Sequence, residues 1–242
     1  MKIQTAFILY HDSPVAMKNL KACVESCKEH GVNPVPFQGV KCIDQEYAKS
    51  QTRLTIDRYF HGETECTIGH VKIWEYISAL PHGIYAVFEN DVIVVGEMPD
   101  IQLTDEQVAF LGFRVRERDQ YIFPKGEETD LIPTTNFEGA HAYALTPGSA
   151  KRLLHMLATM DDNHVDSPVD GLLGINNRYK SELLIVDPPP VVCWVRETRS
   201  FSNTEPASYN IQPTPKFLSG INLRESYNIN RADQRMTWQY WV

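Results

Sequence analysis

The sequence lacks long apolar runs and lacks an excess of basic residues. No stretch of about 18 apolar residues occurs, so no membrane-spanning helix is expected. The 242 residues include 23 lysines and arginines against 31 aspartates and glutamates, a formal net charge of -8. This charge does not rule out nucleic acid, but no basic domain indicates such a ligand, and a polyanion would have to bind at a local patch.

Cysteine is also scarce, with five residues in an odd and scattered set. Cys23 and Cys27 lie four residues apart, but no second Cys/His pair follows them at zinc-binding spacing. This pattern predicts free, buried thiols and a reducing compartment. The first 14 residues have one lysine and a short apolar run that leads into His11 and Asp12, which indicates a first strand rather than a signal peptide. We therefore expect the cytoplasm of a bacterium or of a virus-infected cell.

Apolar segments alternate between the spacing of strands and that of helices, and 43% of the residues are hydrophobic. Ile3–Leu9 predicts a strand, Ser13-Pro14 the start of a helix that ends at Gly31, and Asn33–Phe37 a second strand. This β-α-β start predicts an α/β domain. Further helices are expected at 64–80, 147–160 and 166–175, strands at 84–88, 92–95, 108–115 and 140–145, extended pieces at 183–186 and 190–195, and a loop at 120–138.

The composition shifts near Arg196 to serine, asparagine, proline, arginine and tyrosine. We expect one domain over residues 1–195 and an irregular tail over residues 196–242, packed on the domain or on a partner. The tail ends in Trp238-Gln239-Tyr240-Trp241-Val242. Exposed aromatic side chains lower solubility, so this end is expected to be docked.

The strand that ends in Glu89-Asn90-Asp91 offers two carboxylates two residues apart. Alternate residues of a strand share a face, so Glu89 and Asp91 are expected to aim at one point. Two carboxylates suit a hard divalent cation that bridges to phosphates, and ligands of α/β sheets bind beyond the carboxyl ends of strands. The alternative is a solvated turn, which asparagine and aspartate also favour.

Three other segments carry side chains suited to chemistry. His70 and Trp74 lie on one helical face, and His141 and Tyr143 point the same way from a strand. Asp166 and Asp170 precede or enter an apolar helix. Each has a structural alternative: hydrogen-bonded packing for the histidines, and a helix cap or dipole partner for the aspartates.

The order of these segments resembles glycosyltransferase family 25, the lipooligosaccharide and procollagen galactosyltransferases. The family has a Gly-Glu-x-Gly-Cys-x-x-Ser-His segment with a tryptophan four residues on, then Glu-Asp-Asp, then Gly-x-His-Ala-Tyr, then Val-Asp before an apolar helix. The matching positions are Gly62, Glu63, Cys66, His70, Trp74, Glu89, Asp91, Gly139, His141, Ala142, Tyr143, Ala150, Leu153, Leu154, Val169, Asp170, Leu172 and Leu173. The chain departs from the pattern at Glu65, Gly69 and Asn90.

The resemblance implies a single GT-A type, Rossmann-like α/β domain with a mixed central sheet and a nucleotide-sugar donor, UDP-sugar being expected. It implies Mn²⁺ or Mg²⁺ held by Glu89 and Asp91, which would offset the charge of the leaving diphosphate. His141 is expected near the donor, with His70 as a support. Asp170 is expected to act as the general base, with Asp166 in reserve. Inversion at the anomeric carbon follows by resemblance.

Arg114 and Arg116 alternate after a predicted strand and could present charge to the diphosphate or to an anionic acceptor. A charged edge strand is the alternative. A surface glycan, as in lipopolysaccharide biosynthesis, is the expected acceptor, and a hydroxymethylated DNA base modified by a viral enzyme is the other. A further hypothesis, motivated by Asn90, is a degenerate domain that binds a nucleotide sugar or glycan without turnover.

Overall fold

The computed structural model describes residues 1–42, 44–52, 62–115, 129–134, 140–159, 169, 172–173 and 180–194. Its helices and strands, in chain order, are β1 (Thr5–Tyr10), α1 (Pro14–Glu29), β2 (Asn33–Gln38), α2 (Gln45–Ser50), α3 (Glu63–Ser78), β3 (Tyr85–Glu89), β4 (Val92–Val94), β5 (Gln107–Phe110), β6 (Gly112–Val115), β7 (Asp130–Thr134), β8 (Ala142–Leu145), α4 (Pro147–Thr159), β9 (Glu182–Asp187) and β10 (Val191–Trp194). The predicted tail over residues 196–242 lies outside the described residues.

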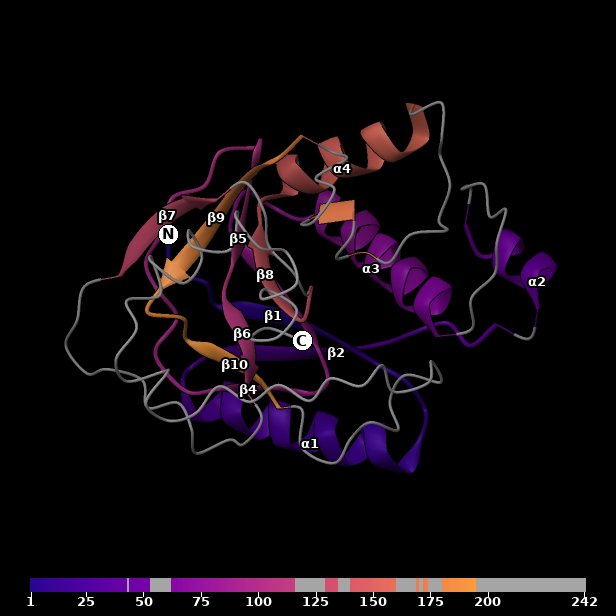
Figure 1. The fold of residues 1–242 in the computed structure, drawn as a ribbon, viewed down its shortest axis with the longest axis horizontal. Coiled ribbons are helices and arrows are strands. Elements are labelled where there is room, and N and C mark those ends of the chain that lie inside the picture. The colour runs from indigo at the N-terminus through magenta and orange to yellow at the C-terminus, as the bar shows by residue number, and fades with distance from the viewer. Residues whose placement is uncertain are drawn as a thin grey trace, which may run out of the picture.

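A seven-stranded sheet in the order β2-β1-β3-β8-β5-β9-β7 forms the centre of the fold (Figure 1). Strands β2, β1 and β3 run parallel, and β5 runs parallel to β9. Strand β8 is antiparallel to β3 and β5, and β7 is antiparallel to β9. The predicted α/β class with a mixed central sheet is therefore confirmed.

The β-α-β start is built as its sequence predicts. Ser13 caps α1 by accepting a hydrogen bond from the Ala16 N–H at 3.2 Å, and Pro14 opens the helix. After the helix, Gly31 takes a φ of 71°, a left-handed conformation that favours glycine. The chain then enters β2, which pairs in parallel with β1 and completes the unit.

Helices cover both faces of the sheet (Figure 1). Ile8 and Phe88 belong to the apolar cluster on the α1 side, together with Leu20 of that helix. Their sequence neighbours Leu9 and Val87 lie in the opposite cluster with Trp74 of α3. This alternation follows from the period of two in a strand, so the sequence of β3 fixes which residues face α3.

Two predictions about strands are wrong. The apolar stretch 108–115 is not one strand but two, β5 and β6, which belong to different sheets. Strand β6 pairs with β10, and β10 with β4, in a separate three-stranded sheet. The predicted loop at 120–138 contains β7, whose Pro133 is tolerated because β7 is an edge strand of the large sheet.

The other predictions concern two helices in the second half of the chain, the cysteines and membrane-spanning segments. The helix predicted at 147–160 is α4, and Thr146 caps it through a hydrogen bond from the Ser149 N–H at 3.0 Å. The helix predicted at 166–175 lies largely outside the described residues. All five cysteines are free, as predicted. No helix within the described ranges is both long enough and apolar enough to span a bilayer.

Candidate functional site

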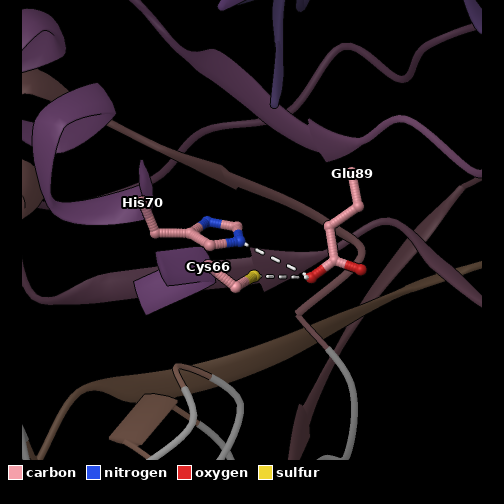
Figure 2. A group of neighbouring side chains, drawn as sticks. All are labelled: Cys66, His70 and Glu89. Atoms are coloured by element: carbon pink, nitrogen blue, oxygen red, sulfur yellow. Dashed lines mark hydrogen bonds and ion pairs between the residues drawn. The ribbon is translucent and has the colours of Figure 1, made fainter. Parts of the chain in front are cut away.

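Glu89 is the last residue of β3, and its carboxylate meets two side chains from the start of α3 (Figure 2). The Cys66 thiol donates to Glu89 Oε1 at 3.6 Å, and His70 Nε2 lies 3.6 Å from the same oxygen. Cys66 and His70 are four residues apart, so one helical turn places both on the side of α3 that faces Glu89. The three ligand-type atoms lie within 4.8 Å of one another and could hold a metal ion.

A buried hydrogen-bond network holds His70 in this position. The imidazole is fully buried, and its Nδ1 lies 2.8 Å from the Tyr143 hydroxyl. Trp74 Nε1, one turn further along α3, donates to the same hydroxyl at 2.8 Å. The His70 and Tyr143 rings also stack, with centroids 5.7 Å apart. With Nδ1 and the ring face both engaged, the imidazole has one orientation, in which Nε2 points at Glu89.

Three segments that are distant in the sequence therefore meet at the carboxyl end of β3. The segment 62–74 supplies Cys66, His70 and Trp74, the strand β3 supplies Glu89, and the segment before and in β8 supplies His141 and Tyr143. The Glu89 N–H donates to the His141 carbonyl at 2.8 Å, which ties the end of β3 to the entry of β8.

The two outer acids of Glu89-Asn90-Asp91 have different neighbours. Asp91 Oδ2 accepts a hydrogen bond from the Cys193 thiol of β10 at 3.3 Å. The charge of Asp91 also affects Cys23 of α1. The pKa of the Cys23 thiol is raised above its ordinary value by a hydrogen bond with Cys27, by burial and by the negative charge of Asp91. Glu89 faces α3, whereas Asp91 contacts the three-stranded sheet, and their common role as metal ligands stays a prediction.

Asn90, between the two acids, has a structural role. Its Nδ2 donates to the Ala16 carbonyl of α1 at 3.0 Å, and the side chain is buried. An aspartate there could not donate this bond when ionised, because a carboxylate is only an acceptor. The amide at this position therefore joins the end of β3 to the first turn of α1.

We expect Asn90→Asp to destabilise the protein by about 1–3 kcal/mol at neutral pH, since a buried carboxylate would face a carbonyl oxygen. The loss should shrink in acid, where the protonated carboxyl can donate. Urea unfolding at several pH values measures both effects. The matched control is Asn33→Asp at an exposed position, which should leave stability nearly unchanged, and an Asn90→Asp protein as stable as the wild type would contradict the expectation.

Glu65 and Gly69, the other departures from the family pattern, also have local functions. Glu65 is buried and accepts the Cys42 N–H at 2.7 Å, which ties the start of α3 to the chain after β2. A Cβ on Gly69 would lie 2.6 Å from Leu9 Cδ1, so the absence of a side chain lets α3 approach β1 closely. Both contacts place the first turns of α3, which carry Cys66 and His70.

Cys42 is expected to be an unreactive thiol. Burial, reinforced by the charges of Glu65 and Asp44, raises its pKa to about 11 from an ordinary value of 9.0. At pH 8 this lowers the thiolate fraction about 100-fold, and the thiolate is the form that reacts. Alkylation with iodoacetamide, followed by peptide mass spectrometry, should show Cys42 reacting at least about 100-fold more slowly in the folded protein than in urea. Equal rates in the two states would contradict this.

The other predicted site residues are placed only in part. Arg114 is in β6, where its backbone pairs with Cys193, but its side chain lies outside the described residues. Arg116, Asp166 and Asp170 also lie outside them. Val169, Leu172 and Leu173 are buried in the apolar cluster on the α3 and α4 side. The sequence analysis names Cys66 only as part of the family pattern and gives it no role in the site, although its spacing of four from His70 on one helix is the signal that could have identified it.

A mixed α/β sheet covered by helices on both faces, with polar groups gathered at the carboxyl end of a strand, defines the class of protein: an α/β domain with a candidate ligand site at a strand end. No family model matches the sequence, and no curated protein does.

Among solved structures, the chain is similar to the glycosyltransferase GlyE of Streptococcus pneumoniae TIGR4, at 11% identity and a TM-score of 0.44. That match covers 99% of this chain and 65% of GlyE, so the chain spans about two thirds of the length of GlyE. A glycosyltransferase involved in the glycosylation of the major capsid of PBCV-1 matches at 12% identity and a TM-score of 0.39, over 79% of this chain and 93% of that one. The inositol-1-phosphate CTP transferase from T. maritima matches at 8% identity and 0.44, over 82% and 91%.

Proposed function

We propose that the chain is a GT-A type glycosyltransferase that moves a sugar from a nucleotide donor, UDP-sugar in the first instance, to an acceptor hydroxyl. The observation that supports this is the convergence of three segments that resemble family 25. Their polar residues Cys66, His70, Glu89 and Tyr143 form one connected group at the carboxyl end of β3. Ligands of open α/β sheets bind at such strand ends.

The resemblance implies that Glu89 and Asp91 hold Mn²⁺ or Mg²⁺, and the described contacts fit such an ion only in part. Hard cations prefer oxygen ligands, which Glu89 supplies. The neighbours of Glu89, however, are the Cys66 thiol and the His70 imidazole. Asp91 accepts a hydrogen bond from Cys193. Because a carboxylate has two oxygens, a shared hard ion could still use the Asp91 oxygen that does not accept from Cys193. We therefore retain the pair as a proposal and assign no step of the reaction to the ion.

The remaining roles concern protons and charge. In a single displacement with inversion, the acceptor hydroxyl loses a proton as it attacks the sugar, and Asp170 is proposed to take it, with Asp166 as the second candidate. His141 is proposed near the donor. Arg114 and Arg116 are proposed to face the diphosphate or an anionic acceptor. These assignments rest on the resemblance and on residue chemistry.

The acceptor is proposed to be a surface glycan, with a hydroxymethylated DNA base as a second class to be screened. The hydrogen-bonded side-chain amide of Asn90 favours one other candidate function, a domain that binds a nucleotide sugar without turnover. Asn90 replaces an acid of the family pattern and serves the contact with Ala16 instead. The two functions differ in a single observable, the release of UDP.

Thermal unfolding of the full chain with a panel of nucleotide sugars, with and without Mn²⁺, tests the proposal. A donor at about 100 times its Kd should stabilise the native state by about 2.7 kcal/mol. UDP release, first with water and then with glycan and modified-DNA acceptors, follows for the donor that binds. No shift with any donor would contradict the proposal, and binding with no release from any acceptor would favour the binding domain.

A further inference from the structure

We propose that Cys66, His70 and Glu89 form a binding site for a borderline divalent transition-metal ion of the Zn²⁺ class. The geometry of the three side chains carries the inference (Figure 2). Two ligands of a tetrahedral zinc ion, with bonds of about 2.0 Å to nitrogen and about 2.3 Å to sulfur, lie about 3.3–3.6 Å apart. The separations to Glu89 Oε1 are 3.6 Å for both Cys66 Sγ and His70 Nε2.

The second observation is the state of His70 Nε2. This nitrogen belongs to a fully buried side chain and has no hydrogen-bond partner among the described residues. Its separation of 3.6 Å from Glu89 is too long for an N–H···O hydrogen bond. A buried polar atom left without a bond destabilises the folded state, and a metal ion between the three groups would supply the missing interaction.

The partner of His70 Nδ1 supports the same assignment. A metal-binding histidine donates its other ring N–H to a second group, which fixes the tautomer and the ring orientation. Here Nδ1 lies 2.8 Å from the Tyr143 hydroxyl, whose oxygen can accept a hydrogen bond from the Nδ1–H. With the proton on Nδ1, the Nε2 lone pair faces Cys66 and Glu89.

The donor set selects the ion. Thiolate and imidazole ligands suit Zn²⁺ and its neighbours, whereas Mg²⁺ takes oxygen ligands. A thiolate and a carboxylate neutralise a divalent charge, which lowers the cost of holding the ion in a partly buried site. Three protein ligands leave one of four tetrahedral positions open, and the Glu89 side chain is 26% exposed, so the open position can take water or an oxygen of a bound molecule.

Cobalt binding tests the site directly. The full chain is reduced, stripped of metal with a chelator and titrated anaerobically with Co²⁺, which reports on tetrahedral zinc sites through its spectrum. We expect a thiolate-to-cobalt charge-transfer band and the visible bands of a four-coordinate ion, both removed by added Zn²⁺. Zinc should also protect Cys66 from alkylation in the wild-type protein, as measured by peptide mass spectrometry.

Amino-acid substitutions distinguish this site from the neighbouring contact between Asp91 and Cys193. Loss of the group that hydrogen-bonds a metal-binding histidine lowers metal affinity about 10–100-fold, so Tyr143→Phe should weaken binding by that factor. Cys66→Ser and Glu89→Gln remove a ligand and should weaken binding by at least as much. Cys66→Ser should also abolish the charge-transfer band. The matched control is Cys193→Ser, which removes a buried thiol that contacts Asp91 rather than Glu89, and it should keep the band and the affinity.

Several outcomes would overturn the inference. These are the absence of a charge-transfer band in the folded wild type, a band that survives Cys66→Ser, equal loss in Cys193→Ser, or no zinc protection of Cys66. Circular dichroism establishes that each variant is folded, and the protection experiment needs no variant. Because metal binding is read without any sugar donor, its failure and the failure of the proposed transferase activity are distinguishable.

Discussion

We expect Glu89→Gln to lower the rate of sugar transfer about 100- to 1000-fold while the protein stays folded. The amide keeps the size of the side chain but removes the negative charge at the point where Cys66 and His70 converge. Loss of one preorganised electrostatic group in a catalytic site has an effect of this size. Under the proposed function, UDP release from the donor identified by thermal shift is the measurement.

The control for this change is Glu182→Gln. Glu182 begins β9, where its carboxylate accepts from Gln107 Nε2 at 3.0 Å in an exposed pair. Strands β9 and β5 run parallel, so this pair lies at the amino end of its strands, whereas Glu89 is at the carboxyl end of β3. Glu182→Gln should leave transfer unchanged. Wild-type rates in Glu89→Gln, or equal losses in both variants, would contradict a special role for Glu89.

The second large effect is expected on stability. Tyr143→Phe should lower the free energy of unfolding by about 2–4 kcal/mol, because it removes the hydroxyl that serves both His70 Nδ1 and Trp74 Nε1. Each buried group left without its partner costs about 1–3 kcal/mol. The ring itself stays apolar and of nearly equal volume, so packing around it should change little. Urea unfolding measures the difference.

Tyr85→Phe provides the matched control for Tyr143→Phe. The Tyr85 hydroxyl donates to the Pro81 carbonyl at 3.1 Å, but this bond is exposed to water, which can replace it. Its loss should change stability by less than about 0.5 kcal/mol. Equal effects of the two substitutions would show that the shared hydroxyl of Tyr143 does not hold the His70 and Trp74 side chains together.

Much of the fold could be predicted from local patterns. The Ser13 cap and Gly31 stop delimit α1, and the period of two in β3 separates the residues facing α1 from those facing α3. Other elements could not be predicted from local patterns. In the stretch 108–115, Gly112 stands where β6 begins and approaches Val191 closely, but a glycine within a strand pattern does not by itself show that the chain changes sheets there. Pro133 argued against a strand at β7, and only its edge position makes that strand acceptable.

The sequence by itself determined the helical spacing that places Cys66 and His70 on one face, and the strand that ends at Glu89. Only the tertiary structure decided which side chains meet there. Alternate residues share a face only where the backbone is extended. Strand β3 ends at Glu89, and Asn90 and Asp91 form a turn, so the spacing of two does not place Glu89 and Asp91 on one face. Glu89 accordingly meets α3, while Asp91 meets Cys193 from a strand about 100 residues further along the chain.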